Sequence, residues 1–315
     1  PRFRNRDLYL YLLCGVFAVG VLALERREKR GGLPMKKSMK RRRIAGNVAA
    51  ETVLIVLSFI WLIPILWIVL QAFRKEPGAM TYTFFPQGLT LDNFTRLFNE
   101  TMFKRWFGNT LLVAVLSCVL STLLVLMVAY SMSRFRFKAR KPFMRVALIL
   151  NMFPGFMSMI AVYYILKAFG LDGQLVSLVL VYAGGAGLGF YVAKGFFDTV
   201  SKTLDEAARL DGATNWQVFW KIILPLSKPI IVYTALMAFI SPWSDFIFAK
   251  VIMGTNRENY TVAIGLFELL EPSRKSTYFT SFAAGSIIVA VPIVLLFMFM
   301  QKYYVEGVTG GAVKG

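Results

Sequence analysis

Residues 201–229 read SKTLDEAARLDGATNWQVFWKIILPLSKP, a polar segment placed between long apolar runs. Thr203 is followed three residues later by Glu206, which is the spacing of a capping box, so a helix is predicted to begin here. Gly212 is expected to end this helix, because glycine adopts the left-handed conformation of a helix end at little cost. The alanines of this first arm leave a shallow surface that suits insertion into a groove on another protein.

A second helix is predicted after the glycine. Thr214 and Gln217 repeat the capping-box spacing, and Pro225 is expected to stop the helix because proline lacks an N–H group. The aromatic side chains of this second arm are Trp216, Phe219 and Trp220. They are expected to anchor either a partner or the loop itself, and a helical hairpin packed only on its own bundle is the alternative interpretation.

The whole segment resembles the EAA loop of the permease subunits of binding-protein-dependent ABC importers. The matching positions are Glu206, Ala207, Ala208, Asp211, Gly212, Ala213, Phe219, Ile222, Leu224, Pro225 and Pro229. In that family the loop forms a coupling helix, which docks in a cleft of a separate ATPase subunit and moves with it as ATP is bound and hydrolysed. The positions that the resemblance implies as contacts and hinge are Glu206, Ala207, Ala208 and Gly212. It also implies that Asp211 and Pro225 hold the shape of the loop.

On either side of this loop the chain is dominated by apolar runs. Hydrophobic residues make up 57% of the 315 residues, charged residues make up 17%, and the mean hydropathy is +0.59. Apolar runs of about twenty residues are long enough to cross the hydrocarbon core of a bilayer. The predicted spans are 49–70, 108–131, 143–166, 175–197, 230–250 and 281–301. We therefore predict an all-α, polytopic membrane protein with the six-helix core of an ABC importer permease.

The net charge of +19 is explained by where Lys and Arg are placed. The segments predicted to face the cytoplasm are 25–47, 133–142, 198–229 and 302–315, and together they hold 21 basic residues. The segments predicted on the opposite side are 71–106, 168–174 and 254–280, and together they hold 8. Because basic residues accumulate on cytoplasmic loops, both ends of the six-span unit are predicted to be cytoplasmic. This distribution favours membrane lipid as the surrounding partner and argues against nucleic acid.

Residues 1–34 precede the region that resembles the family, which covers about 44–315. They contain an apolar run at 8–24, followed by a charged stretch. Two interpretations stay open, an extra anchoring helix or an appended segment. A cleaved signal peptide is less favoured, because no small-residue cleavage site precedes the charged stretch. Residues 35–315 then form the six-span permease domain, with its coupling loop at 201–229.

The sequence offers little that could carry out catalysis. It has no His, and its two cysteines, Cys14 and Cys118, lie apart in apolar runs, so neither a metal site nor a disulfide framework is predicted. The motif Gly-x-x-x-x-Gly-Lys-[Ser/Thr], which cradles ATP phosphates, is absent from the sequence. The run GGAGLG at 184–189 lies in an apolar span, where glycines are expected to let helices approach closely. We expect no catalytic residue and no cofactor bound by this chain, and the resemblance implies that a separate ATPase subunit dimer uses ATP and Mg²⁺.

The end of the chain, YYVEGVTGGAVKG at 303–315, is similar to the C-terminal tail of maltose/maltodextrin importer permeases, in particular the smaller of the two membrane subunits. The resemblance implies that the chain forms a translocation path with a second permease subunit. An extracytoplasmic sugar-binding protein would deliver the oligosaccharide substrate. Maltose or maltodextrin is expected, with another oligosaccharide or a polyol as the alternative. The implied location is the bacterial cytoplasmic (inner) membrane, which the chain crosses several times.

Polar residues at membrane depth are candidates for lining this path. They are Asn151, Tyr163, Tyr164, Ser241, Trp243 and Asp245. Helix breaks are expected near 154–155 and 241–245. Sugars are bound by aromatic faces together with hydrogen-bonding side chains, and these residues provide that combination. Hydrogen bonding between helices is the alternative role for each of them, and Asp245 could instead pair with Lys250.

Two long segments on the predicted external side, 71–106 and 254–280, are expected to be loops that meet a partner, with passive connectors as the alternative. A short helix is expected near 262–270. The polar tip at 254–260 is expected to be exposed and flexible. The residues that the resemblance implies as contacts with the sugar-binding protein are Gly254, Thr255, Asn256 and Arg257.

Two other function classes fit the sequence less well. An ion-coupled secondary transporter would show internal repeats and acidic residues at mid-membrane, but we find no repeat, and Asp245 is the one acidic residue in a suitable position. A membrane-embedded enzyme is disfavoured by the lack of His, the most frequent general base. Dependence of uptake on ATP and on a separate ATPase subunit distinguishes the importer from the secondary transporter.

Overall fold

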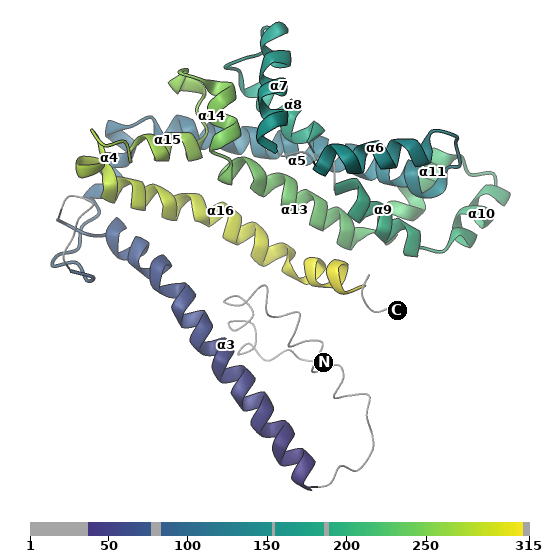
Figure 1. Ribbon diagram of the computed structural model, residues 1–315, viewed down its shortest axis with the longest axis horizontal. Coiled ribbons are helices and arrows are strands. Elements are labelled where there is room, and N and C mark those ends of the chain that lie inside the picture. Colours follow the sequence, from purple (N-terminus) through teal and green to yellow (C-terminus); the bar gives the residue numbers. More distant parts are fainter. Residues whose placement is uncertain (1–36, 77–82, 153–154, 186–188, 311–315) are drawn as a thin grey trace.

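The helix α5 (Phe103–Arg134) runs through the middle of the molecule and determines where the other helices lie (Figure 1). Its buried positions recur every three or four residues, as at Thr110, Val113, Ser117 and Ser121, which is the spacing of one helix face. This face packs against α8, α9 and α13. The small side chains among these positions allow the neighbouring helices to approach closely.

The computed structural model describes residues 37–76, 83–152, 155–185 and 189–310. In chain order its helices are α3 (Lys37–Ala72), α4 (Asp92–Glu100), α5 (Phe103–Arg134), α6 (Arg140–Met152), α7 (Gly155–Ala168), α8 (Leu175–Gly184), α9 (Gly189–Thr199), α10 (Lys202–Leu210), α11 (Asn215–Val218), α12 (Leu224–Leu226), α13 (Lys228–Ser244), α14 (Ile247–Met253), α15 (Val262–Glu268) and α16 (Lys275–Gly310). The all-α prediction is confirmed, since no strand occurs in these described ranges. The predicted extension at 1–34 and residues 311–315 of the tail lie outside them.

Three helices in the described ranges are long and apolar enough to cross a membrane, namely Ala50–Ala72 of α3, the whole of α5, and Lys275–Gln301 of α16. Two more spans result if each bent pair of helices counts as one. These pairs are α8 with α9, bent by 42°, and residues 215–226 with α13, bent by 85°. The structure thus supports three to five of the six predicted spans by length and composition.

The predicted span 143–166 is the one that neither a long helix nor a bent pair provides. Its residues fall in α6 and α7, which lie on either side of residues 153–154, outside the described ranges. Each of these two helices is too short to cross a membrane alone. The break expected at 241–245 is confirmed, because α13 ends at Ser244 and α14 begins at Ile247.

The helix α3 contributes the most exposed apolar surface. None of the most apolar 18-residue window in Ala50–Ala72 is buried, and Trp61 is 72% exposed. Figure 1 shows α3 diverging from the other helices. Exposed apolar surface of this extent indicates contact with lipid or with another membrane subunit.

Two hydrophobic clusters lie near the two ends of α5. The first includes Trp106, Tyr260 and Ile264, and the second includes Tyr130 and Phe219. Accordingly, α4 and α15 lie at one end of the molecule in Figure 1, and α10 and α11 lie at the other. The long loops predicted for opposite sides of the membrane are therefore found at opposite ends of the bundle.

Two glycines allow α5, α15 and α16 to meet at the first of these ends. A Cβ atom on Gly265 would lie 2.1 Å from Cε3 of Trp106, and one on Gly285 would lie 2.5 Å from Cδ2 of Leu266. Both distances are far below van der Waals contact, so any larger residue would force α15 away from its neighbours.

Candidate functional site

The first arm of segment 201–229 is the helix α10 (Lys202–Leu210), which begins two residues earlier than the capping-box pattern predicts. Ser201 is the N-cap, and its hydroxyl accepts a hydrogen bond from the N–H of Thr203 at 3.3 Å. The predicted box between Thr203 and Glu206 is therefore wrong, because Thr203 already lies inside the helix. The predicted end is confirmed, since Gly212 follows the helix with a φ of +85°, a conformation that disfavours side chains.

The second arm begins as predicted but does not end at its proline. Thr214 and Gln217 form a complete capping box, with N–H to side-chain oxygen distances of 2.8 and 3.3 Å. The chain then passes through a π-helical turn, Phe219–Ile223, and continues past Pro225 to the end of α12. Pro225 is tolerated because it lies in the first turn of α12, where no N–H is needed. The 85° bend before α13 follows at Ser227.

The two faces of α10 differ sharply in exposure. Asp205 and Ala208 are buried against the bundle, and the role that the resemblance implies for Ala208 at the partner stays a prediction. Glu206 and Ala207 are exposed, and Leu210 is 90% exposed. The other positions of the EAA pattern differ in burial: Asp211, Gly212 and Pro225 are exposed, Ala213, Ile222 and Pro229 are half-buried, and Phe219 and Leu224 are buried.

The aromatic residues of the second arm also divide between the bundle and the surface. Phe219 is buried, and its ring lies 4.9 Å from the ring of Tyr130 on α5, measured between centroids. Trp216 is 58% exposed and Trp220 is 41% exposed. Phe219 therefore anchors the loop to its own bundle, whereas the two tryptophans offer exposed rings beside the first arm.

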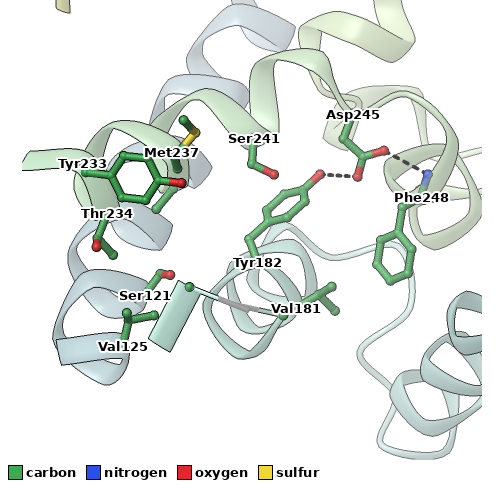
Figure 2. Close-up of a pocket in the computed structure, with 13 residues that line it drawn as sticks. Ser121, Val125, Val181, Tyr182, Tyr233, Thr234, Met237, Ser241, Asp245 and Phe248 are labelled. Carbon is green, nitrogen blue, oxygen red and sulfur yellow. Dashed lines mark hydrogen bonds between the residues drawn. The ribbon is translucent and has the colours of Figure 1, made fainter. Parts of the chain in front are cut away.

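A pocket of about 510 Å³ lies between α5, α8 and α13 (Figure 2). Its lining residues are Ser121, Val125, Val181, Tyr182, Gly185, Gly189, Tyr233, Thr234, Met237, Ala238, Ser241, Asp245 and Phe248. It thus combines aromatic and apolar walls with several hydroxyl groups and one carboxylate. Among the described residues, no group of His, Cys, Asp and Glu could hold a metal ion.

Asp245 is fixed at the break between α13 and α14. The hydroxyl of Tyr182 donates to Oδ2 of Asp245 at 2.8 Å, and Oδ1 accepts the backbone N–H of Phe248 at 3.0 Å (Figure 2). The alternative pairing of Asp245 with Lys250 is not found, because the Lys250 ammonium group donates to the hydroxyl of Tyr260. The carboxylate therefore stabilises the start of α14 and faces the pocket through Tyr182.

The structure brings together only part of the predicted path. Ser241 and Asp245 line the pocket, but Trp243 is buried and packs against Phe107, with ring centroids 5.2 Å apart. Tyr163 and Tyr164 pack on each other on α7 and do not line the pocket. The side chain of Asn151 lies outside the described part of the structure.

Four polar residues of the pocket are not among the path residues predicted from the sequence, namely Ser121, Tyr182, Tyr233 and Thr234. Each is a polar residue within a predicted apolar span, which is the same signal that selected Ser241. The sequence alone does not show that these four residues face the same pocket, because this depends on how α5, α8 and α13 pack.

The glycine run of α8 has a different role from the predicted helix packing. A Cβ atom on Gly184 would meet nothing within 4 Å. Gly185 ends α8, donating its N–H to the carbonyl of Val181 at 2.7 Å, and lines the pocket. Among the described glycines of the run, Gly184 and Gly185 end α8 and Gly189 begins α9, and both Gly185 and Gly189 line the pocket. Residues 186–188 lie outside the described ranges.

The tip at 254–260, which was predicted to be external, is exposed only from 254 to 258. Asn259 is half-buried and Tyr260 is buried, contrary to the prediction, and contacts hold the tip in place. Gly254, Thr255, Asn256 and Arg257 are all exposed. An ion pair of 2.8 Å joins Glu258 to Arg105 on α5, and another of 2.6 Å joins Arg257 to the buried Glu268. The expectation of a freely flexible tip is therefore not supported. The expected helix after the tip is confirmed as α15 (Val262–Glu268).

Side chains of α5 also bind the backbone of this tip. The indole N–H of Trp106 donates to the carbonyl of Arg257 at 3.0 Å, and the amide of Asn109 donates to the carbonyl of Tyr260 at 3.0 Å. The segment from 257 to 260 is consequently tied to the first turns of α5.

The chain is similar in sequence to known membrane components of transport systems. Residues 121–310 match the family model described as "Binding-protein-dependent transport system inner membrane component". A maltodextrin transport system permease protein of Bacillus subtilis is 36% identical over 87% of this chain and 98% of its own length. A galactooligosaccharides transport system permease protein of the same organism is 33% identical over 89% of this chain and 100% of its own length.

A maltose/maltodextrin transport system permease protein of Vibrio parahaemolyticus is 30% identical over 89% of this chain and 98% of its own length. Among solved structures, a chain of a bacterial ABC transporter involved in the import of the acidic polysaccharide alginate has the same fold. The TM-score is 0.73 and the sequence identity is 22%. The match covers 86% of this chain and 100% of the alginate transporter chain. The chain therefore belongs to the family of inner membrane components of binding-protein-dependent transport systems.

Proposed function

We propose that this chain is the permease subunit of an ATP-driven importer of maltose or maltodextrin. It forms the translocation path with a second permease subunit and receives the sugar from an extracytoplasmic binding protein. The observation that carries the proposal is the form of segment 201–229, a helical hairpin that presents one exposed face at the end of the bundle opposite α15. A face of this kind suits docking into a groove of a partner.

The exposed face of α10 is the part that we assign to the ATPase subunit dimer. Glu206, Ala207 and Leu210 form this face, and the turn at Gly212 sets the angle of the second arm. ATP and Mg²⁺ are used by the partner ATPase in this proposal, and the permease converts the movement of that subunit into movement of its own helices.

The pocket between α5, α8 and α13 is the part that we assign to the sugar path. A tyrosine ring can pack on the apolar face of a sugar ring, and hydroxyl and carboxylate groups can form hydrogen bonds with the sugar hydroxyls. Tyr182, Ser241 and Asp245 supply these groups on this chain. The second permease would close the open side of the pocket.

The substrate class rests on the relatives. Maltodextrin or maltose occurs in the names of relatives that are 36%, 34% and 30% identical to this chain. Galacto-oligosaccharides are the second candidate, because the relative named for them is 33% identical over its whole length.

The topology that accompanies this proposal places 201–229 and 302–315 in the cytoplasm. The external side then holds 71–106 and 254–280, with Gly254–Arg257 exposed toward the sugar-binding protein. Residues 35–315 form one permease domain. Support comes from the basic residues, of which 21 lie in the proposed cytoplasmic segments and 8 in the external ones.

Labelling of single cysteines tests this topology. In a chain carrying Cys14→Ala and Cys118→Ala, a membrane-impermeant thiol reagent added outside the inner membrane should label Thr255→Cys. Asn215→Cys should be labelled only after permeabilisation, because both positions are exposed but lie at opposite ends of the bundle. Labelling of position 215 without permeabilisation would reverse the topology.

Uptake into proteoliposomes tests the function. The complete complex with its second permease, ATPase and binding protein should accumulate radiolabelled maltotriose only when ATP is supplied. Glu206→Lys and Gly212→Pro should insert normally but lose uptake and co-purification of the ATPase, because the first inverts a charge on the docking face and the second cannot adopt a φ of +85°. Normal assembly and uptake in both variants would refute the role of the loop, and uptake of galacto-oligosaccharides alone would select the second substrate.

The pocket is tested by a matched pair of tyrosine substitutions. Tyr182→Phe removes the hydroxyl that donates to Asp245, and uptake should fall about two- to tenfold, the effect expected for loss of one hydrogen bond. Tyr164→Phe removes a hydroxyl on α7, away from the pocket, and should leave uptake unchanged. Equal effects of the two substitutions, or none for Tyr182→Phe with normal ATPase assembly, would argue against the pocket as the sugar path.

A further inference from the structure

The last residue of α5 reaches directly into the coupling segment. Nε of Arg134 lies 2.9 Å from Oδ2 of Asp205 on α10, and the two side chains are only 1% and 7% exposed. Nη2 of Arg134 also donates to the carbonyl of Val200 at 3.0 Å, just before α10 begins. One guanidinium group therefore joins α5 both to α10 and to the segment that enters it.

The surroundings of this ion pair fix the end of α5, but α10 lies between a bend at Val200 and a turn at Asp211–Gly212. Ser133 donates to Asp198 at 2.6 Å on α9, and Tyr130 packs on Phe219 of the second arm. These contacts hold the elements before and after α10. Between them, α10 runs from its N-cap at Ser201 to the turn before the second arm, and its outer face is free of the bundle.

The ion pair is poorly suited to a purely stabilising role. Nη1 of Arg134 and Oδ1 of Asp205 make no hydrogen bond to any of the described residues, and the contact at Nε lacks hydrogen-bond alignment. Taking two charges out of water is costly, and apolar residues of similar volume often stabilise a protein equally well. In some proteins a buried ion pair instead fixes the relative position of the two elements that carry the charges.

We propose that Arg134 and Asp205 are positioning residues that make α10 move together with α5 during the transport cycle. This inference rests on the proposed coupling function of α10. When the ATPase subunits displace the exposed face of α10, the ion pair transfers that displacement to α5, whose buried face lines the sugar pocket at Ser121. Without the ion pair, α10 shifts about the bend at Val200 and the turn at Gly212, and ATP is hydrolysed without movement of α5.

The test uses the complete complex with the double variant Arg134→Met/Asp205→Leu, which removes both charges and leaves no unpaired one. The ATPase should still co-purify, because the exposed face of α10 is unchanged. ATP hydrolysis should continue, while sugar uptake falls, so that the number of ATP molecules hydrolysed per sugar rises by about five- to 150-fold, the range of ordinary coupling free energies. Arg134→Lys keeps the charge and should give a smaller rise than the double variant.

The control is Lys138→Gln, which removes an exposed charge shortly after α5 that is not part of the ion pair, and its number of ATP molecules hydrolysed per sugar should equal that of the wild type. An unchanged ratio in Arg134→Met/Asp205→Leu would overturn the proposal. Loss of ATPase co-purification in that variant would also overturn it, because the pair would then only shape the docking face. Failure of the wild-type complex to couple uptake to ATP would instead refute the proposed function.

Discussion

The attachment of both ends of α5 is the constraint on which the rest of this structure depends. At one end, Trp106 and Asn109 hold the backbone of the external segment by hydrogen bonds. At the other end, Arg134 holds α10 through a buried ion pair. The helix between them is continuous over 32 residues, and a continuous helix transmits displacement along its axis with little loss. Segments 201–229 and 254–260 are thereby both attached to α5, although they lie at opposite ends of the bundle.

The interrupted helices complement this rigid element. Non-helical backbone at membrane depth is tolerated where protein covers it or where it lines a polar cavity, because unpaired N–H and C=O groups are costly in hydrocarbon. The break between α13 and α14 satisfies this condition, since Asp245 accepts the N–H of Phe248 and contacts Tyr182 in the pocket. The end of α8 at Gly185 lies at the same pocket. The breaks thus supply polar groups to the proposed sugar path, while α5 supplies its continuous wall.

The features predicted correctly from the sequence are those that depend on residues close together in the chain. The helical class and the left-handed turn at Gly212 follow from hydropathy and from backbone sterics, and both were found. The N-cap of α10 was predicted at Thr203 but lies at Ser201, because either hydroxyl side chain can cap a helix and only two positions separate them. The passage beyond Pro225 depends on a π-helical turn held by tertiary packing. The contact between Tyr182 and Asp245 joins residues 63 positions apart, and no spacing rule reports such a pair.

Distance measurement between the two ends of this chain tests the central claim most directly. Spin labels on Leu210→Cys and Thr255→Cys, both at exposed positions, report on α10 and on the external tip within the assembled transporter. If α5 joins these segments into one body, pulsed electron resonance should give the same distance distribution in the nucleotide-free and ATP-bound complexes. A shift of the whole distribution on ATP binding would show that the two segments move independently and would contradict the account.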